Sequence, residues 1–253
     1  MPSYSAQGLV IHRLNLGETD KICTLFTREF GKLSAVVKGA RKAGSRLSGA
    51  TELFTQSRFL LASGKSLDIV TQCEIDAVYS DLRLDLERLA RASYYCELLD
   101  RFTMERDAIT SAELFDVTVE ALRRLQAAQT DDLDLAVHAY ELRLLDALGY
   151  APVLDRCVRC DGPLYGKLCG FSPVLGGTLC ASDRYKADDA QGLSQSAIEL
   201  LQALAQSEDG DFPAAPDAKT AAELNRALRW YIRSRTERDL RTADFLDQLR
   251  AGS

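Results

Sequence analysis

The stretch Leu67-Asp-Ile-Val-Thr-Gln-Cys-Glu-Ile75 alternates between two sets of side chains. Successive side chains of a β-strand point to opposite faces of a sheet, so this period of two predicts a half-buried strand. The buried face is expected to carry Leu67, Ile69, Thr71, Cys73 and Ile75, and the other face Asp68, Val70, Gln72 and Glu74.

Four similar runs precede that stretch, at residues 8–14, 22–27, 32–38 and 53–62, with glycine-containing turns between them. Five short strands in the first third of the chain favour a small closed barrel, because closure leaves no sheet edge open. A five-stranded barrel of this length suits an OB-fold, and an SH3-like barrel fits the same pattern.

Beyond residue 78 the apolar residues recur with the period of an α-helix. Gly149 and Pro152 are expected to end this helical region, and helices resume near Ser194 and after Asp217. The predicted fold class is α+β, a five-stranded OB-fold barrel followed by an all-helical domain with an embedded zinc-ribbon-like loop. The expected domains are the OB-fold over residues 1–79 and the helical domain over residues 80–253, with the ribbon-like insertion at residues 155–185.

Composition narrows the class of protein. The chain has 253 residues, of which 46% are hydrophobic, enough for one or two domains with cores of their own. It shows neither a run of about 18 apolar residues nor a secretory signal at its start, so no membrane association is expected. Seven cysteines are an odd number, and four of them cluster, which favours a reducing compartment such as the cytoplasm.

Catalytic chemistry finds little support in the sequence. The chain has two histidines and lacks a His-Glu-x-x-His motif. Its one dense carboxylate group, Asp131, Asp132 and Asp134, suits the first turn of a helix, where negative charge is stabilised. The protein is therefore not expected to be an enzyme.

Charge is segregated along the chain. The net charge of −6 argues against a nucleic-acid-binding surface over the whole protein. Residues 1–76 nevertheless carry a net +3, residues 77–156 a net −7 and residues 157–253 a net −2. Residues 28–58 alone carry a net +5, so a nucleic-acid contact is expected in this part of the barrel.

The cations that dominate this segment are Lys32, Lys38, Arg41, Lys42 and Arg46. The last three stand in a loop of small residues, which would offer backbone N–H groups and positive charge to phosphates. The loop is not a nucleotide P-loop, since Ser45 rather than lysine follows Gly44. It indicates sequence-independent binding to a DNA or RNA backbone, and a merely solvated loop is the alternative.

A second signal is Cys157-Val-Arg-Cys160, a knuckle-like turn whose two thiolates can reach one tetrahedral ion. Cys169 and Cys180 follow, and four thiolates would make a structural zinc site. A second Cys-x-x-Cys is broken, because Asp183 stands at its last position. The fourth ligand is therefore Cys169 or Asp183, and a zinc-free ribbon with buried thiols is the alternative.

A third signal is the stripe Arg226, Arg229 and Arg233 on one side of a predicted helix. Such a stripe suits an acidic peptide or DNA, and it also fits a solvated face that pairs with Asp and Glu.

Segments over nearly the whole chain resemble, in order, those of the bacterial RecO family of recombination mediators. They lie at residues 8–11, 17–21, 25–33, 37–42, 45–47, 94–100, 143–152, 157–160, 171–173 and 176–180. Leu25-Phe-Thr-Arg-Glu-Phe-Gly-Lys-Leu33 and Arg143-Leu-Leu-Asp-Ala-Leu-Gly-Tyr-Ala-Pro152 are two of them. An ordered set of this extent is far more specific than any single motif.

The resemblance implies an OB-fold and a helical domain with a zinc-finger-like ribbon. It implies a protein of DNA repair and homologous recombination that binds single- and double-stranded DNA and anneals complementary strands. With RecR, in the RecFOR pathway, such a protein would help RecA load onto DNA coated by single-strand binding protein. The C-terminal tail of single-strand binding protein would dock on the helical domain.

The same resemblance assigns DNA binding to Lys32, Lys38, Arg41, Lys42 and Arg46. It assigns the ribbon to Cys157, Cys160 and Cys180, and Asp183 departs from relatives that end the ribbon in Cys-x-x-Cys. Arg226, Arg229 and Arg233 are candidates for tail docking. The expected location is the cytoplasm, in association with the nucleoid. The alternative function is a zinc-containing scaffold for protein interactions without direct DNA binding.

Overall fold

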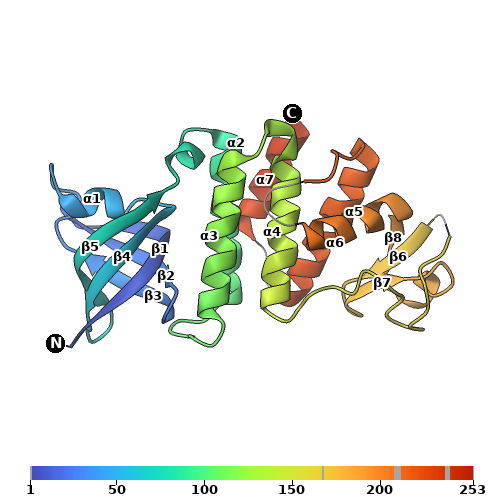
Figure 1. Ribbon diagram of the computed structural model, residues 1–253, viewed down its shortest axis with the longest axis horizontal. Helices are drawn as coiled ribbons and strands as arrows, with labels where there is room; N and C mark the ends of the chain where they lie inside the picture. The colour runs from blue at the N-terminus through green and yellow to red at the C-terminus, as the bar shows by residue number, and fades with distance from the viewer. Residues whose placement is uncertain (1, 167, 208–211, 237–239, 253) are drawn as a thin grey trace. The chain divides into compact units, whose positions relative to one another are not determined.

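The computed structural model describes residues 2–166, 168–207, 212–236 and 240–252 (Figure 1). They form two compact units, one made of Met1–Gln126 with Arg241–Ser253 and the other of Ala127–Leu240. Helices that follow the barrel in sequence thus pack in one unit with it. This division differs from the expected domains 1–79 and 80–253, whose bounds stay a prediction.

The first unit contains the closed barrel. Its strands are β1 (Ser3–Leu16), β2 (Asp20–Thr27), β3 (Gly31–Val37), β4 (Thr55–Ala62) and β5 (Asp68–Val78), and the short helix α1 (Arg46–Ala50) lies between β3 and β4. Around the barrel the order is β1-β2-β3-β5-β4, with β3 and β5 parallel and the other neighbours antiparallel. This topology is that of an OB-fold, which confirms the predicted fold class.

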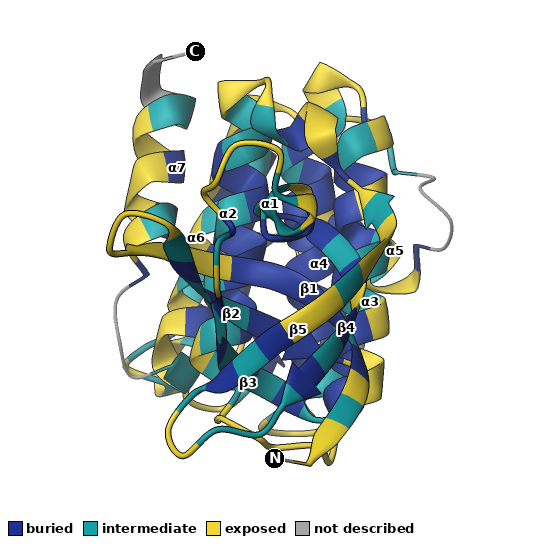
Figure 2. Cartoon of the chain, turned by 90° about the vertical axis from the view of Figure 1, so that its left-hand side faces the viewer, coloured by how far each residue is buried: buried dark blue, intermediate teal, exposed yellow. Residues whose placement is uncertain are grey.

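Alternation along the strands fills the barrel, as the burial colours of Figure 2 show. Leu25, Leu33, Phe59 and Leu61 point inward and are fully buried. Burying apolar side chains of this size stabilises the fold by about 1.5–3 kcal/mol each. The barrel therefore has a hydrophobic core of its own.

The predicted faces of β5 are partly wrong. Asp68 and Val70 are buried, whereas Thr71 and Ile75 are exposed. The register between β4 and β5 shifts at Leu60/Leu61, and such a bulge inserts one unpaired residue. Because one extra residue exchanges the two faces of a strand, the inward set changes partway along β5, and Cys73 packs against the core as expected.

The rest of the first unit is helical, with η1 (Ser80–Arg83), α2 (Leu86–Phe102), α3 (Ser111–Ala127) and α7 (Arg241–Gly252). The Asp85 carboxylate begins α2 by accepting the N–H groups of Glu87 and Arg88. Glu97 of α2 accepts the N–H groups of Arg241 and Thr242 at distances of 3.1 and 2.8 Å. A carboxylate at a helix N-terminus is favourable, so Glu97 ties the start of α7 to α2.

The second unit holds the remaining elements. They are η2 (Thr130–Asp132), α4 (Leu133–Ala147), β6 (Leu168–Ser172), β7 (Gly177–Leu179), η3 (Arg184–Lys186), β8 (Gln191–Ser194), α5 (Gln195–Gln206) and α6 (Ala218–Thr236). Gly149 has a φ of +75°, a conformation that favours glycine and ends helices, as predicted. The three-stranded sheet β7-β6-β8 lies between α4 and α5 in sequence. Strands β6 and β7 fall within the expected ribbon-like insertion at residues 155–185, β8 lies beyond it, and the bounds of the insertion stay a prediction.

Among the residues that the structure describes, no helix is both long and apolar enough to cross a bilayer.

Candidate nucleic-acid interface and metal centre

The basic loop begins where β3 ends and runs into α1. Lys38, Arg41, Lys42 and Arg46 are all exposed on it. In the described part of the chain, Lys38, Lys42 and Arg46 form no ion pair with Asp or Glu. Four of the five predicted DNA-binding cations are thus displayed together at one end of the barrel.

Backbone contacts fix the shape of this loop. The Arg41 guanidinium donates to the carbonyl of Gly17 (2.7 Å), and the Arg41 N–H donates to the carbonyl of Thr19 (2.9 Å). Gly39 has a φ of +69°, which side chains with a Cβ rarely adopt. The loop is therefore held against the β1–β2 turn, and its cations project from a defined backbone.

One carboxylate organises the junction of loop and turn. Asp20 accepts the Gly39 N–H at 2.8 Å and the Thr19 hydroxyl at 2.8 Å. The pKa of Asp20 is lowered below its ordinary value, mainly by the hydrogen bond from Gly39 and next by that from Thr19. The nearby charges of Lys38 and Lys42 lower it further. Asp20 is thus a carboxylate that stays ionised and holds the start of the loop to the β1–β2 turn.

Lys32, the fifth predicted DNA-binding cation, lies in a different environment, and its assignment to DNA binding stays a prediction. Its Nζ donates to the Asp100 carbonyl (2.7 Å), the Asp100 Oδ1 (3.0 Å) and the Thr103 carbonyl (2.8 Å). The side chain is 13% exposed. All three ammonium donors have acceptors within the unit, so Lys32 joins β3 to the end of α2.

The same segment covers more of the barrel. The N–H of Arg106 donates to the carbonyl of Lys32 at 2.8 Å, and the Ser34 hydroxyl contacts Glu105. OB-folds commonly bind oligonucleotides on the face of their second and third strands and on the loops that flank it. In this chain residues 103–106 cover part of that face. The accessible cations of this region therefore lie on the loops that flank the face, chiefly on the basic loop between β3 and α1.

Lys65 was missed by sequence reasoning. It is exposed in the β4–β5 turn, one of the two turns that border the ligand face of OB-folds. A single lysine between Gly64 and Ser66 creates no charge cluster, so only the barrel topology draws attention to it.

The ribbon brings four potential metal ligands together. They are Cys157, Cys160, Cys180 and Asp183, whose ligand atoms all lie within 4.8 Å of one another. The Sγ atoms of Cys160 and Cys180 are 4.0 Å apart, and Asp183 Oδ2 lies 3.5 and 3.6 Å from the Sγ atoms of Cys157 and Cys180. A tetrahedral zinc with ~2.3 Å bonds places its sulfurs roughly 3.8 Å apart. The donor set therefore fits a zinc ion.

Of the two residues considered for the fourth position, the structure brings Asp183 to the cluster. Cys169 lies outside it, buried, with its Sγ directed at the Tyr165 carbonyl 3.8 Å away. Cys169 sits on β6, whereas Cys180 and Asp183 share the turn that follows β7. That turn delivers its two residues to the Cys157-x-x-Cys160 knuckle, which spacing alone did not reveal.

Protonation within the cluster is uneven. Burial opposes ionisation of Cys157, but the backbone N–H groups of Cys180, Cys160 and Arg159 outweigh it and lower the pKa of this thiol. The ammonium of Lys186, 2.6 Å from Asp183 Oδ1, and a hydrogen bond from Cys160 lower the pKa of Asp183 to about 2. At Cys160 the backbone N–H of Gly162 favours the thiolate, but the hydrogen bonds with Cys157 and Asp183 raise the pKa to about 11. Cys157 and Asp183 are therefore the ligands that ionise most readily, and a bound cation would favour loss of the remaining thiol protons.

The arginine stripe lies on α6. Arg226 and Arg233 are exposed, Arg229 is half-buried, and the three flank Trp230, which is 51% exposed. The three arginines are spaced three and four residues apart, so they lie on one side of the helix.

The fold and these sites together define an OB-fold protein with a helical part and a ribbon that carries metal-ligand side chains. Comparison with known proteins narrows this class. The family model "Recombination protein O N terminal" matches residues 1–79, and "Recombination protein O C terminal" matches residues 83–244.

Curated relatives agree with these models. A DNA repair protein RecO of Symbiobacterium thermophilum is 40% identical over 99% of both chains. That of Roseiflexus sp. is 39% identical over 98% of this chain and 86% of the relative, and that of Pelotomaculum thermopropionicum is 37% identical over 98% and 95%. The chain belongs to the RecO family of DNA repair and recombination proteins.

Proposed function

We propose that the protein is a recombination mediator that binds single- and double-stranded DNA and anneals complementary strands. The observation that carries this proposal is the set of exposed cations Lys38, Arg41, Lys42 and Arg46, held on a fixed loop of the OB-fold. They contact phosphates and not bases, so binding is independent of sequence.

The mechanism of annealing is electrostatic. Two DNA strands repel each other through their phosphates, and cations that hold both lower this barrier until bases pair. Release of counterions drives the binding, so affinity falls steeply with salt. No bond is made or broken, and the proposed activity needs no catalytic residue.

We propose the partners that the family resemblance implies. The protein acts with RecR in the RecFOR pathway, on DNA coated by single-strand binding protein, and thereby helps RecA load. Arg226, Arg229 and Arg233 on α6 are proposed to receive the acidic C-terminal tail of single-strand binding protein. The proposed location is the cytoplasm, at the nucleoid.

Zinc is the proposed metal. Cys157, Cys160, Cys180 and Asp183 would hold it, and its role would be structural, since four protein ligands complete a tetrahedral shell. The metal would replace a larger hydrophobic core in this small ribbon.

The test of function is an annealing assay with complementary oligonucleotides over a range of salt, with and without single-strand binding protein. The variant carries Lys38→Glu and Lys42→Glu. Its matched control carries Lys219→Glu and Arg226→Glu, which change the net charge equally on α6. We expect the annealing rate of the loop variant to fall at least tenfold, because two phosphate contacts become repulsive. Without single-strand binding protein, the annealing rate of the control should stay within twofold of that of the unmodified protein.

Equal annealing by both variants and the unmodified protein would remove the loop from the mechanism. Absence of any DNA binding at low salt by the unmodified protein would favour the alternative, a zinc-containing interaction scaffold.

A further inference from the structure

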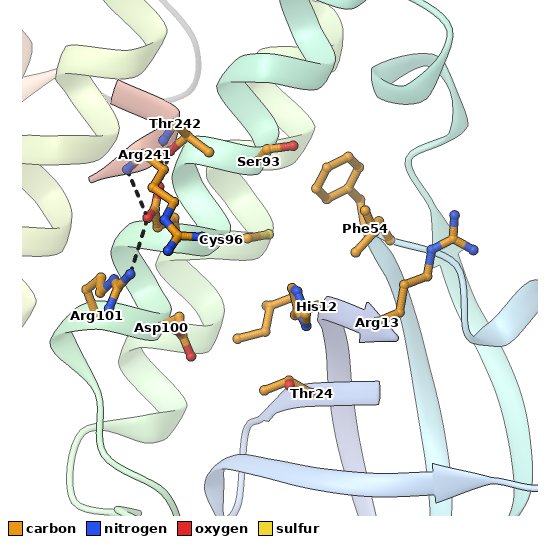
Figure 3. A pocket seen from close by; sticks show the side chains of 13 residues that line it. His12, Arg13, Thr24, Phe54, Ser93, Cys96, Asp100, Arg101, Arg241 and Thr242 are labelled. Carbon is orange, nitrogen blue, oxygen red and sulfur yellow. Dashed lines mark hydrogen bonds and ion pairs between the residues drawn. The ribbon is translucent and has the colours of Figure 1, made fainter. Parts of the chain in front are cut away.

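A cavity of about 580 Å³ lies in the first unit, where β1 and β2 of the barrel face α2 and the start of α7 (Figure 3). Its apolar lining comes from Ile11, Leu53, Phe54 and Cys96. Its polar lining includes His12 and Arg241, which approach from the barrel and from α7. This volume is in the range of sites that hold a small ligand.

The cavity opens on the outer surface of the barrel. His12 of β1 and Thr24 of β2 are register partners, and both line it. Farther along the sheet, Lys32 and Ser34 of β3 are covered by residues 100–106. The cavity is therefore a place where the strand face stays open beside the helices that cover the rest.

The charges around the cavity favour an anion. Its two carboxylates are already engaged, Asp100 by Lys32 and Glu97 by Arg101 and the start of α7. The guanidinium of Arg241 is exposed and, in the described part of the chain, pairs with no carboxylate. An anionic group that enters here meets at least one uncompensated positive charge.

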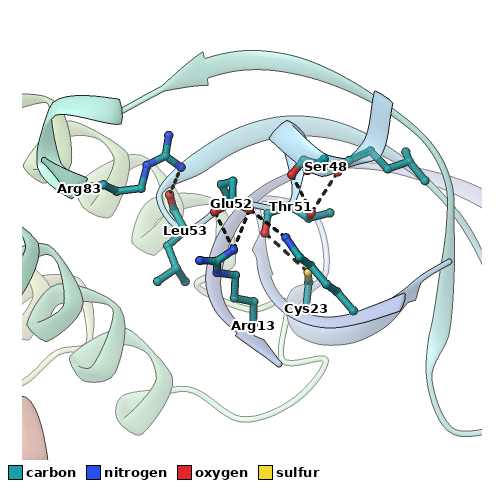
Figure 4. A network of polar contacts seen from close by, with 9 residues as sticks. Arg13, Cys23, Ser48, Thr51, Glu52, Leu53 and Arg83 are labelled. Carbon is teal, nitrogen blue, oxygen red and sulfur yellow. Dashed lines mark hydrogen bonds and ion pairs between the residues drawn. The ribbon is translucent and has the colours of Figure 1, made fainter. Parts of the chain in front are cut away.

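Polar contacts surround Glu52, beside the cavity (Figure 4). Glu52, next to the lining residue Leu53, binds both Arg13 (2.6 Å) and Lys21 (2.8 Å). From Arg13 to Leu16 the β1 strand spans ~10 Å, and the next residue, Gly17, has the carbonyl that holds Arg41. That length covers roughly three phosphates of one stacked DNA strand.

We propose that this cavity takes one unstacked nucleotide of a single-stranded DNA whose neighbouring phosphates lie on the basic loop. The base enters the apolar side of the cavity, and Arg241 and His12 contact its phosphate. The proposal rests on the proposed function, since it extends the DNA path from the loop. A base in a duplex is stacked and paired, so the cavity contributes to single-strand binding and not to duplex binding.

Two variants test the cavity by different means. Ser93→Phe fills it without changing charge, and Arg241→Ala removes the unpaired cation while leaving the backbone N–H groups that Glu97 binds. Their matched controls on α6 are Ala222→Phe, which adds the same ring at an exposed position, and Lys219→Ala, which removes an exposed cation that has no proposed binding role. The readout is the affinity for an oligothymidylate and for a duplex of the same length, at one low salt concentration.

We expect both cavity variants to lose about fivefold or more in affinity for the oligothymidylate, the loss of one stacked base, with duplex affinity within twofold of the unmodified protein. Both controls should match the unmodified protein. Arg241→Ala keeps the test valid if Ser93→Phe does not fold, because its side chain is exposed.

Unchanged single-strand affinity in Arg241→Ala would overturn the proposal, and so would an equal loss for duplex and single strand. A cavity variant that loses binding of an acidic peptide but keeps its affinity for DNA would also overturn it. Failure of the proposed function is distinguishable, because the Lys38→Glu, Lys42→Glu variant would then leave both DNA affinities unchanged.

Discussion

Lys32 and Lys38 show how two residues of the same type, six positions apart, acquire different tasks. The sequence places both in a basic segment, and nothing in their spacing separates them. In the structure, Lys32 is enclosed by carbonyls of α2 and the loop after it, whereas Lys38 is exposed at the end of β3. Contacts between distant segments decide this difference, so the sequence pattern could not predict it.

The two lysines therefore predict opposite outcomes for one substitution. Lys32→Met removes the donor to the partly buried carbonyls of Asp100 and Thr103 and is expected to lower the free energy of unfolding by about 1–3 kcal/mol. DNA affinity of the folded variant should stay within twofold. Lys38→Met should keep the stability and lower DNA affinity, and thermal melting with a parallel binding titration checks both. If Lys32→Met is as stable as the unmodified protein but binds DNA more weakly, Lys32 contacts DNA.

Asp183 and Cys169 give a second contrast at this scale. We expect about one zinc per purified chain, lost on Cys157→Ser and strongly reduced on Asp183→Ala, because each removes a ligand. Cys169→Ser should keep the metal, since its sulfur lies outside the cluster. Metal analysis of the purified variants decides this. If zinc stays bound in Asp183→Ala and is lost in Cys169→Ser, the fourth ligand is Cys169 and not Asp183.

At the scale of elements, periodicity predicted more than local detail. The five strands and the helical region from α2 to α4 occur where the alternation and the 3.6-residue period indicated. The face of β5 was partly wrong because the β-bulge depends on its pairing with β4. The five residues of α1 and the four of β8 escaped prediction, since elements this short show too few periods. Spacing predicted Cys157, Cys160 and Cys180 as candidate metal ligands, but the choice of Asp183 over Cys169 needed the turn after β7.

Helix α3 carries a testable ion-pair cluster. Glu120 binds Arg123 at 2.7 Å and Arg124 at 2.9 Å, and these bonds lower the pKa of Glu120 to about 2. The ordinary pKa of a glutamate is 4.5, and the folded protein lowers that of Glu120 to about 2. The ionised carboxylate therefore stabilises the fold fully above pH 4.5, and this stabilisation is lost as the pH falls toward 2. Glu120→Gln should therefore be less stable than the unmodified protein at pH 7, with a difference that shrinks below pH 4.5 and vanishes near pH 2.

Urea unfolding from pH 7 to pH 2 measures that difference. Glu18→Gln is the matched control, because Glu18 is exposed in the β1–β2 turn and has no ion pair among the described residues. A stability difference for Glu120→Gln that does not change with pH would show that the carboxylate contributes through packing and not through charge.

At the scale of the whole molecule, a net charge of −6 is compatible with the proposed DNA binding because the cations are local. Residues 28–58 carry a net +5, and those on the loop are exposed, while residues 77–156 carry a net −7. Under the proposed function, an acidic remainder would repel DNA and confine it to the basic region. Neutralising the acidic residues should then raise non-specific binding without moving the binding site.

The central claim is that DNA is bound by phosphate contacts from Lys38, Arg41 and Lys42. The most direct test is the slope of the logarithm of single-strand affinity against the logarithm of salt concentration, for the unmodified protein and for the triple variant Lys38→Glu, Arg41→Glu, Lys42→Glu. Each lost contact flattens the slope by about 0.7 for single strands, so the account predicts a slope shallower by about 2 and a much weaker affinity. An unchanged slope and affinity in a folded triple variant would contradict it.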